Sequence, residues 1–159
     1  MNTVPQWLSA AGAPPELLHR LQREVEGLPE SYPDLLRIGN GGEVGLSVRP
    51  YNLCLDAAED ALDYWLSGAY TKQNVFVIGG NGGGELIAFD LGNAGKSRVI
   101  CYDPISPDDS AEVIAENFEK LLEFCEVVYP AYPVALQRVI SRNLRSFLTQ
   151  SRDFVDAQV

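Results

Sequence analysis

Residues 74–91 read NVFVIGGNGGGELIAFDL, two apolar segments joined by a run of glycines. Asn74 to Ile78 is apolar at successive positions, which is typical of a central strand buried on both faces. Glu85 to Leu91 predicts a second strand and Arg98 to Tyr102 a third, after a turn-forming segment at 92–96. Because the connections are too short for a crossover helix, we expect these three strands to be antiparallel.

The glycine run at 79–84 allows two interpretations. Glycine-rich loops bind phosphate when they lead from a strand into the N-terminus of a helix. Here the run leads into a predicted strand, and it lacks the Gly-Lys-Ser/Thr ending of nucleotide-binding loops. The sequence therefore favours a flexible β-turn over a phosphate site.

The segments before residue 74 predict three helices and two more strands. The first helix has two prolines at its start and ends at Gly27. Asp56 and Glu59 have the spacing of a capping box, which predicts a helix starting at Asp56. The predicted elements are helices at about 14–26, within 28–36 and from 56 through 66, and strands at 43–48 and 51–55.

Residues from about 110 to 125 predict one further helix with a charged outer face. The apolar residues that recur at helical intervals on one face are Ile114, Phe118, Leu121, Leu122 and Cys125. Residues 103–126 hold eight carboxylates against Lys120, which leaves a net charge of −7. Such a patch would speed the encounter with a basic protein, although the same charges could simply solvate a surface helix. The predicted partner-binding residues are Asp108, Asp109, Glu112, Glu116, Glu119 and Glu123.

A last helix is predicted after Pro130 and Pro133. Residues 131–159 carry a net charge of +2, whereas residues 1–130 carry −12. We expect an α+β fold over 1–130, with a central antiparallel sheet flanked by helices. A C-terminal helical extension over 131–159 is expected to pack on the same domain.

Charge and hydropathy indicate which classes of partner and which cellular location to expect. The 159 residues carry a net charge of −10, which would repel nucleic acid and anionic lipid and attract a basic protein, although acidity can also serve solubility alone. No apolar run approaches the roughly 20 residues that span a bilayer. The N-terminal segment lacks the basic and apolar regions of a signal peptide, so we expect a cytoplasmic location.

The residues capable of chemistry are few. The single histidine, His19, projects opposite the apolar side of the first helix, which indicates a surface position. Cys54, Cys101 and Cys125 form no C-x-x-C pair and lie in apolar segments, so we interpret them as small buried residues. Paired carboxylates of a hydrolase could come from Glu85, Asp90 and Asp103, but solvated turn residues explain them better. We therefore expect no catalytic residue, no metal and no cofactor.

Several segments, taken in order, resemble the SUKH superfamily, which includes the SMI/KNR-type proteins. The resemblance covers about residues 14–125 and rests on Leu28-Pro29, Tyr32, Leu35-Leu36, Asn40-Gly41-Gly42, the strand pair of 75–91 and Ile114 to Leu122. It implies an α+β domain without catalysis or cofactor, in which Asn40, Gly41, Gly42, Gly82, Gly83 and Gly84 form structural turns. It also implies either an immunity protein that neutralises a cognate secreted toxin, often a nuclease, or a regulatory interaction protein.

Three functional hypotheses follow. The first is a non-catalytic immunity protein whose partner is a basic toxin domain, the second a regulatory or scaffolding module, and the third a small-molecule-binding or hydrolytic enzyme. Whether the chain forms a homodimer stays an open question. Tyr51, Trp65 and Tyr70 could belong to the core or to an aromatic contact patch.

Overall fold

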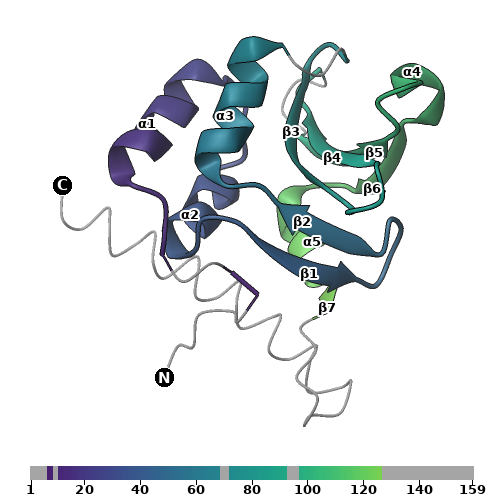
Figure 1. Ribbon diagram of the computed structural model, residues 1–159, viewed down its shortest axis with the longest axis horizontal. Helices are drawn as coiled ribbons and strands as arrows, with labels where there is room; N and C mark the ends of the chain where they lie inside the picture. Colours follow the sequence, from purple (N-terminus) through teal and green to yellow (C-terminus); the bar gives the residue numbers. More distant parts are fainter. Residues whose placement is uncertain (1–6, 9–10, 69–71, 93–96, 127–159) are drawn as a thin grey trace, which may run out of the picture.

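The computed structural model describes residues 7–8, 11–68, 72–92 and 97–126 (Figure 1). The predicted C-terminal extension and Tyr70 lie outside these residues. The helices are α1 (Pro15–Glu24), α2 (Ser31–Ile38), α3 (Ala58–Ser67), α4 (Pro107–Ser110) and α5 (Phe118–Glu123). The strands are β1 (Gly42–Leu46), β2 (Asn52–Leu55), β3 (Val75–Gly80), β4 (Leu86–Asp90), β5 (Arg98–Tyr102), β6 (Glu112–Ala115) and β7 (Cys125–Glu126).

The strands form one curled, seven-stranded sheet in the order β6-β5-β4-β3-β2-β1-β7. Every neighbouring pair is antiparallel, which confirms the expectation for β3, β4 and β5. Gly79 lies where β2 meets β3, and a Cβ atom there would collide with the carbonyl of Cys54. A glycine at this position therefore lets the two strands approach closely enough to pair.

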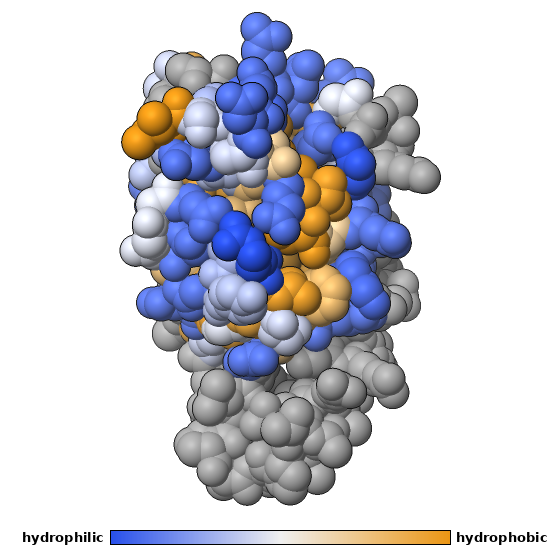
Figure 2. Space-filling view, turned by 90° about the vertical axis from the view of Figure 1, so that its right-hand side faces the viewer, coloured by the Kyte–Doolittle hydropathy of each residue, from blue (hydrophilic) through white to orange (hydrophobic). Residues whose placement is uncertain are grey.

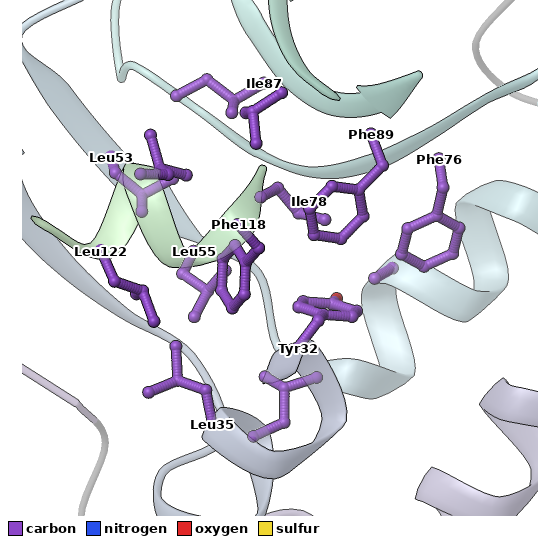
Figure 3. Close-up of a cluster of buried hydrophobic side chains, with 14 of the residues drawn as sticks. Tyr32, Leu35, Leu53, Leu55, Phe76, Ile78, Ile87, Phe89, Phe118 and Leu122 are labelled. Atoms are coloured by element: carbon purple, nitrogen blue, oxygen red, sulfur yellow. The ribbon is translucent and has the colours of Figure 1, made fainter. Parts of the chain in front are cut away.

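The helices α1, α2 and α3 lie together on one side of the curled sheet (Figure 1). The main core between helices and sheet contains Tyr32, Phe89 and Phe118, none of which is exposed (Figure 3). The Tyr32 and Phe89 ring centroids are 5.2 Å apart, and those of Phe89 and Phe118 are 5.4 Å apart, both with edge-to-face geometry. Such pairs contribute about 0.5–1.5 kcal/mol each beyond the burial of their area, so this cluster fixes α2 and α5 against the sheet.

The other face of the sheet carries a smaller apolar cluster. It is formed by Val75, Val77, Ala88, Ile100 and Tyr102, all of them buried. The short helix α4 contacts β5, and Lys72 reaches from the segment before β3 to Asp108 of α4. Both faces of β3 are therefore buried, as its continuous apolar sequence predicts.

The helix predicted over 110–125 is wrong. Glu112–Ala115 is instead the edge strand β6, paired with β5 through Ile100 and Cys101, and a helix resumes only at Phe118. Val113 and Ile114 are β-branched and suit a strand. Asn117 then starts α5, because its Oδ1 accepts a hydrogen bond from the Lys120 amide at 2.7 Å.

The capping box predicted for α3 is also wrong. The helix starts at Ala58, and Asp56 makes no capping hydrogen bond. The cap comes instead from Asn40, whose Oδ1 accepts from the Ala58 amide at 2.7 Å. Asn40 Nδ2 donates to Glu59 Oε2 at 2.8 Å. The Asn-Gly-Gly turn thus has the structural role expected of it, and it joins the start of β1 to α3.

Candidate functional site

The six predicted partner-binding residues are distributed over three elements and one turn. Asp108 and Asp109 lie in α4, Glu112 in β6, Glu116 in the turn before α5, and Glu119 and Glu123 in α5. All except the half-buried Glu119 are exposed. The expectation of one continuous helical face is therefore wrong, whereas the expectation that these residues bind a partner stays a prediction.

These carboxylates belong to one stretch of the chain, 108–123, which runs from α4 through β6 to α5. We call them the acidic margin: Asp108, Asp109, Glu112, Glu116, Glu119 and Glu123. The strand β6 forms one edge of the sheet, α4 directly precedes it and α5 directly follows it (Figure 1). The charge is thus carried by an edge strand and its two flanking helices.

Three residues of the acidic margin form ion pairs. Lys72 Nζ lies 2.8 Å from Asp108 Oδ1, Arg49 Nε lies 3.3 Å from Glu112 Oε2, and Lys120 Nζ lies 3.1 Å from Glu123 Oε2. Counting Arg49 and Lys72 with Lys120, and adding Glu85 because it shares Arg49, three cations face nine carboxylates, so the local net charge is −6 rather than −7. The described part of the chain gives no ion pair to Asp109, Glu116 or Glu119.

Arg49 joins three segments that are far apart in sequence. Besides Glu112, it pairs with Glu85, with Nη2 3.2 Å from Oε2. Glu85 also accepts a hydrogen bond from Asn81 Nδ2 at 3.2 Å. The hydrogen bond to Glu112 and the charge of Glu85 raise the pKa of Arg49, so the guanidinium stays charged. Arg49 thereby ties the tip of the β1–β2 hairpin to β6 and to the start of β4.

The glycine run is a turn of the β3–β4 hairpin. Gly82 and Gly84 have φ angles of +79° and +106°, which glycine adopts at little cost. Asn81 Oδ1 accepts hydrogen bonds from the amides of Gly83 at 2.8 Å and Glu85 at 3.1 Å. These backbone donors are therefore already bonded within the turn, and the run leads into β4 as predicted.

The three carboxylates considered for hydrolysis each have a partner within the fold. Glu85 pairs with Arg49, and Asp90 Oδ2 lies 3.2 Å from Arg98 Nη2. Asp103 Oδ1 accepts from the Ile105 amide at 2.9 Å. Glu85 directly precedes β4 and Asp90 is its last residue, so the two lie roughly 17 Å apart for an extended strand. This distance is too long for the two carboxylates to act on one glycosidic bond.

The histidine and the cysteines occupy the kinds of position that the sequence predicts, with one exception. His19 is exposed on α1, and Cys101 and Cys125 are buried, whereas Cys54 is half-buried. Burial raises the pKa of Cys101 and of Cys125 to about 12, so both thiols stay protonated at neutral pH.

Among the described residues, no group of three or more His, Cys, Asp or Glu side chains is arranged to hold a metal ion. None of the described helices is long and apolar enough to cross a membrane.

A hollow of about 120 Å³ lies on the molecule away from the glycine run, lined by Tyr64, Trp65, Gly68, Lys72, Val75 and Val77. Trp65 packs on Phe76 with ring centroids 5.9 Å apart, so it belongs to the margin of the core.

Tyr51 is 65% exposed at the tip of the β1–β2 hairpin. Of the two described aromatic residues that the sequence left open, Tyr51 is exposed and Trp65 is half-buried.

Sequence reasoning missed Arg49 and Lys72. Their acidic partners Glu112 and Asp108 lie 63 and 36 residues away, so no local spacing signals either pair. Tyr51 was recognised as an aromatic residue of interest, but its exposure depends on the turn that it occupies.

Comparison with known families agrees with the fold. Residues 12–123 match the model of the SMI1 / KNR4 family (SUKH-1). A search of curated proteins finds no significant match.

Proposed function

Because the chain belongs to the SMI1 / KNR4 family (SUKH-1), a family associated with immunity proteins, we propose that it neutralises a cognate secreted toxin. In this proposal the chain is a non-catalytic binding domain, and its partner is a basic toxin domain, such as a nuclease. The acidic margin is the contact surface.

The observation that carries the proposal is the unbalanced charge of the acidic margin. Asp109 and Glu116 are exposed, and the described residues supply no cation to either. A nuclease surface is basic because it binds phosphates, and carboxylates can occupy the same positions. Opposite charge also speeds the encounter, which suits a protein that must reach a toxin before the toxin reaches its target.

The test is affinity purification of the tagged full chain from its source cells at low and at moderate salt. Each basic protein recovered is then expressed in a host with and without the chain, and growth is measured. We expect a recovered protein to be toxic alone and harmless with the chain. Recovery only of proteins that do not impair growth would refute neutralisation and would favour a regulatory module of the same family.

The role of the acidic margin is tested by reversing two of its charges. We expect Asp109→Lys combined with Glu116→Lys to slow association with the toxin about tenfold at low salt and to weaken its salt dependence. The matched control is Glu16→Lys combined with Glu24→Lys, which makes the same charge change on exposed positions of α1. Equal slowing in both variants would show that net charge, and not this margin, steers the encounter.

A further inference from the structure

The face of the sheet that carries the smaller apolar cluster has a row of apolar residues across four strands. The register aligns one residue from each of β3, β4, β5 and β6, which we call the apolar row: Val77, Ala88, Ile100 and Val113. Side chains of directly paired residues lie on the same face of a sheet. The first three are buried, whereas Val113, at the outer end of the row, is 46% exposed. Figure 2 views the molecule from the side on which α4 lies, and apolar surface gathers near its middle with hydrophilic surface around it.

Residues 103–111, which include α4, extend across this face, and we call them the flap. The flap leaves β5 after Tyr102, at the end of the sheet where β3 finishes. Asp108 of the flap nevertheless reaches Lys72, which precedes the start of β3 and lines the hollow together with Val77. The flap and the Lys72 side chain therefore span from β5 across β4 to the opposite end of β3, on the face that carries the apolar row.

Hydrogen bonds within the flap close it on itself. The Ser110 hydroxyl accepts from the Asp103 amide at 2.7 Å and donates to the Ser106 carbonyl at 2.8 Å. The Ser110 amide donates to the same carbonyl at 3.1 Å. None of the residues 103–111 is buried, and Ile105 is 91% exposed. The flap is therefore a compact unit that places no side chain of its own in the core.

One ion pair joins the flap to the far side of this face. Lys72 Nζ lies 2.8 Å from Asp108 Oδ1, and 89% of the Asp108 side chain is exposed, against 18% of the Lys72 side chain. Because water can solvate so exposed a carboxylate when the pair breaks, such a pair holds a segment only weakly. Within the part of the chain that the structure describes, no other ion pair or side-chain hydrogen bond joins the flap to another segment.

We propose that the flap is a hinged cover over the apolar row and that the Lys72–Asp108 pair is its latch. A compact segment with no buried residue and one weak tie can move as a unit at small cost, because its own hydrogen bonds stay intact. Opening uncovers buried residues of the row next to the exposed Val113, so the apolar surface available for contact grows. Salt, which weakens the exposed ion pair, shifts this equilibrium towards the open state. The flap does not depend on the proposed toxin partner.

Relaxation-dispersion NMR of the full chain tests the flap, since hinge motions occur on the microsecond to millisecond timescale. The wild type is compared with Lys72→Met, which removes the latch and keeps an apolar stem. The matched control is Lys120→Met, which breaks the exposed Lys120–Glu123 pair of α5. We expect the amides of 103–111 and the methyl groups of Ile100 to share one exchange process. The open population should rise about two- to fivefold in Lys72→Met, the range for an exposed ion pair, and stay level in Lys120→Met.

Salt supplies a second readout of the latch. High ionic strength should raise the open population of the wild type and of Lys120→Met but not that of Lys72→Met, because the last has no latch to lose. The methyl groups of Leu53, buried in the main core, should show none of this exchange. The inference is overturned by equal open populations in the wild type and Lys72→Met, or by exchange that is absent at Ile100. It is also overturned if Leu53 shares the exchange, because the motion would then be global unfolding.

Discussion

Replacing Asp56 with asparagine should stabilise the domain at neutral pH. Burial, with the nearby charge of Asp60, raises the pKa of the Asp56 carboxyl from 3.8 to about 6. The described residues give the carboxylate no hydrogen bond, because Asn40 occupies the capping position at α3. The charged form is therefore disfavoured in the folded state, and asparagine removes that charge with almost no change in shape.

The size of the effect follows from the pKa. A carboxyl pKa near 6 in the folded chain against 3.8 in the unfolded chain corresponds to about 3 kcal/mol against the charged form. Because Asp56 is only half-buried, water screens much of this penalty, and we expect about 1 kcal/mol at pH 7. The folded state binds the proton more tightly, so the wild type gains stability as the pH falls from about 6 towards 4. The advantage of Asp56→Asn is therefore complete above pH 6 and disappears near pH 4.

Urea denaturation at pH 4, 5, 6 and 7 measures this difference. Asp63→Asn is the matched control, since Asp63 is exposed on the same helix and loses the same charge. The result that would refute the reasoning is a loss of stability in Asp56→Asn at pH 7. A favourable interaction of the charged carboxylate with the N-terminus of α3 would produce that loss, because asparagine can replace aspartate as a cap but carries no charge.

Two further substitutions test the structural analysis. Asn40→Ala removes the α3 cap and its hydrogen bond to Glu59, so we expect a loss of about 1–2 kcal/mol in the free energy of unfolding; in urea denaturation, a loss no larger than that of the exposed-site control Gln73→Ala would contradict the cap. Phe118→Ala leaves a cavity beside Tyr32 and Phe89 and should cost about 3–5 kcal/mol, measured by thermal unfolding. A cost below about 1 kcal/mol would show that α5 is not part of the core.

The sequence predicted the centre of the sheet because pairing there is local. Residues 74–91 form one hairpin, and β5 follows a few residues later in the chain, so the pattern of each segment is enough to place its neighbour. The same reasoning failed at 110–125. Ile114, Phe118 and Leu121 have helical spacing, yet Ile114 lies in a strand whose existence depends on β5. Phe118 and Leu121 do face the core from α5. The pattern therefore predicted correctly that these residues are buried, but it predicted one helix where the chain forms a strand and a shorter helix.

The candidate site could likewise be predicted only in part from the sequence. Exposure of the acidic residues could be predicted because charged side chains seldom lie in a core. Their pairing could not, since Arg49 and Lys72 lie on segments far in sequence from Glu112 and Asp108. The α3 cap is a comparable case, because Asn40 lies 18 residues before Ala58 and no local motif joins the two. Contacts between distant segments determine these features, and they appear only in the folded chain.

The last described strand, β7, completes one end of the sheet. Cys125 and Glu126 pair with Leu46 and Gly45, so β7 covers the outer edge of β1, a strand made some eighty residues earlier. During synthesis β1 to β5 can pair as each emerges, and Trp7 and Leu8 contact the edge of β1 at Gly42 and Glu43. The edge at Gly45 and Leu46 has no such cover until residue 126 has left the ribosome. An open edge is a template for pairing with other chains. The order of synthesis therefore gives this domain an interval of exposure to aggregation, and β7 ends it.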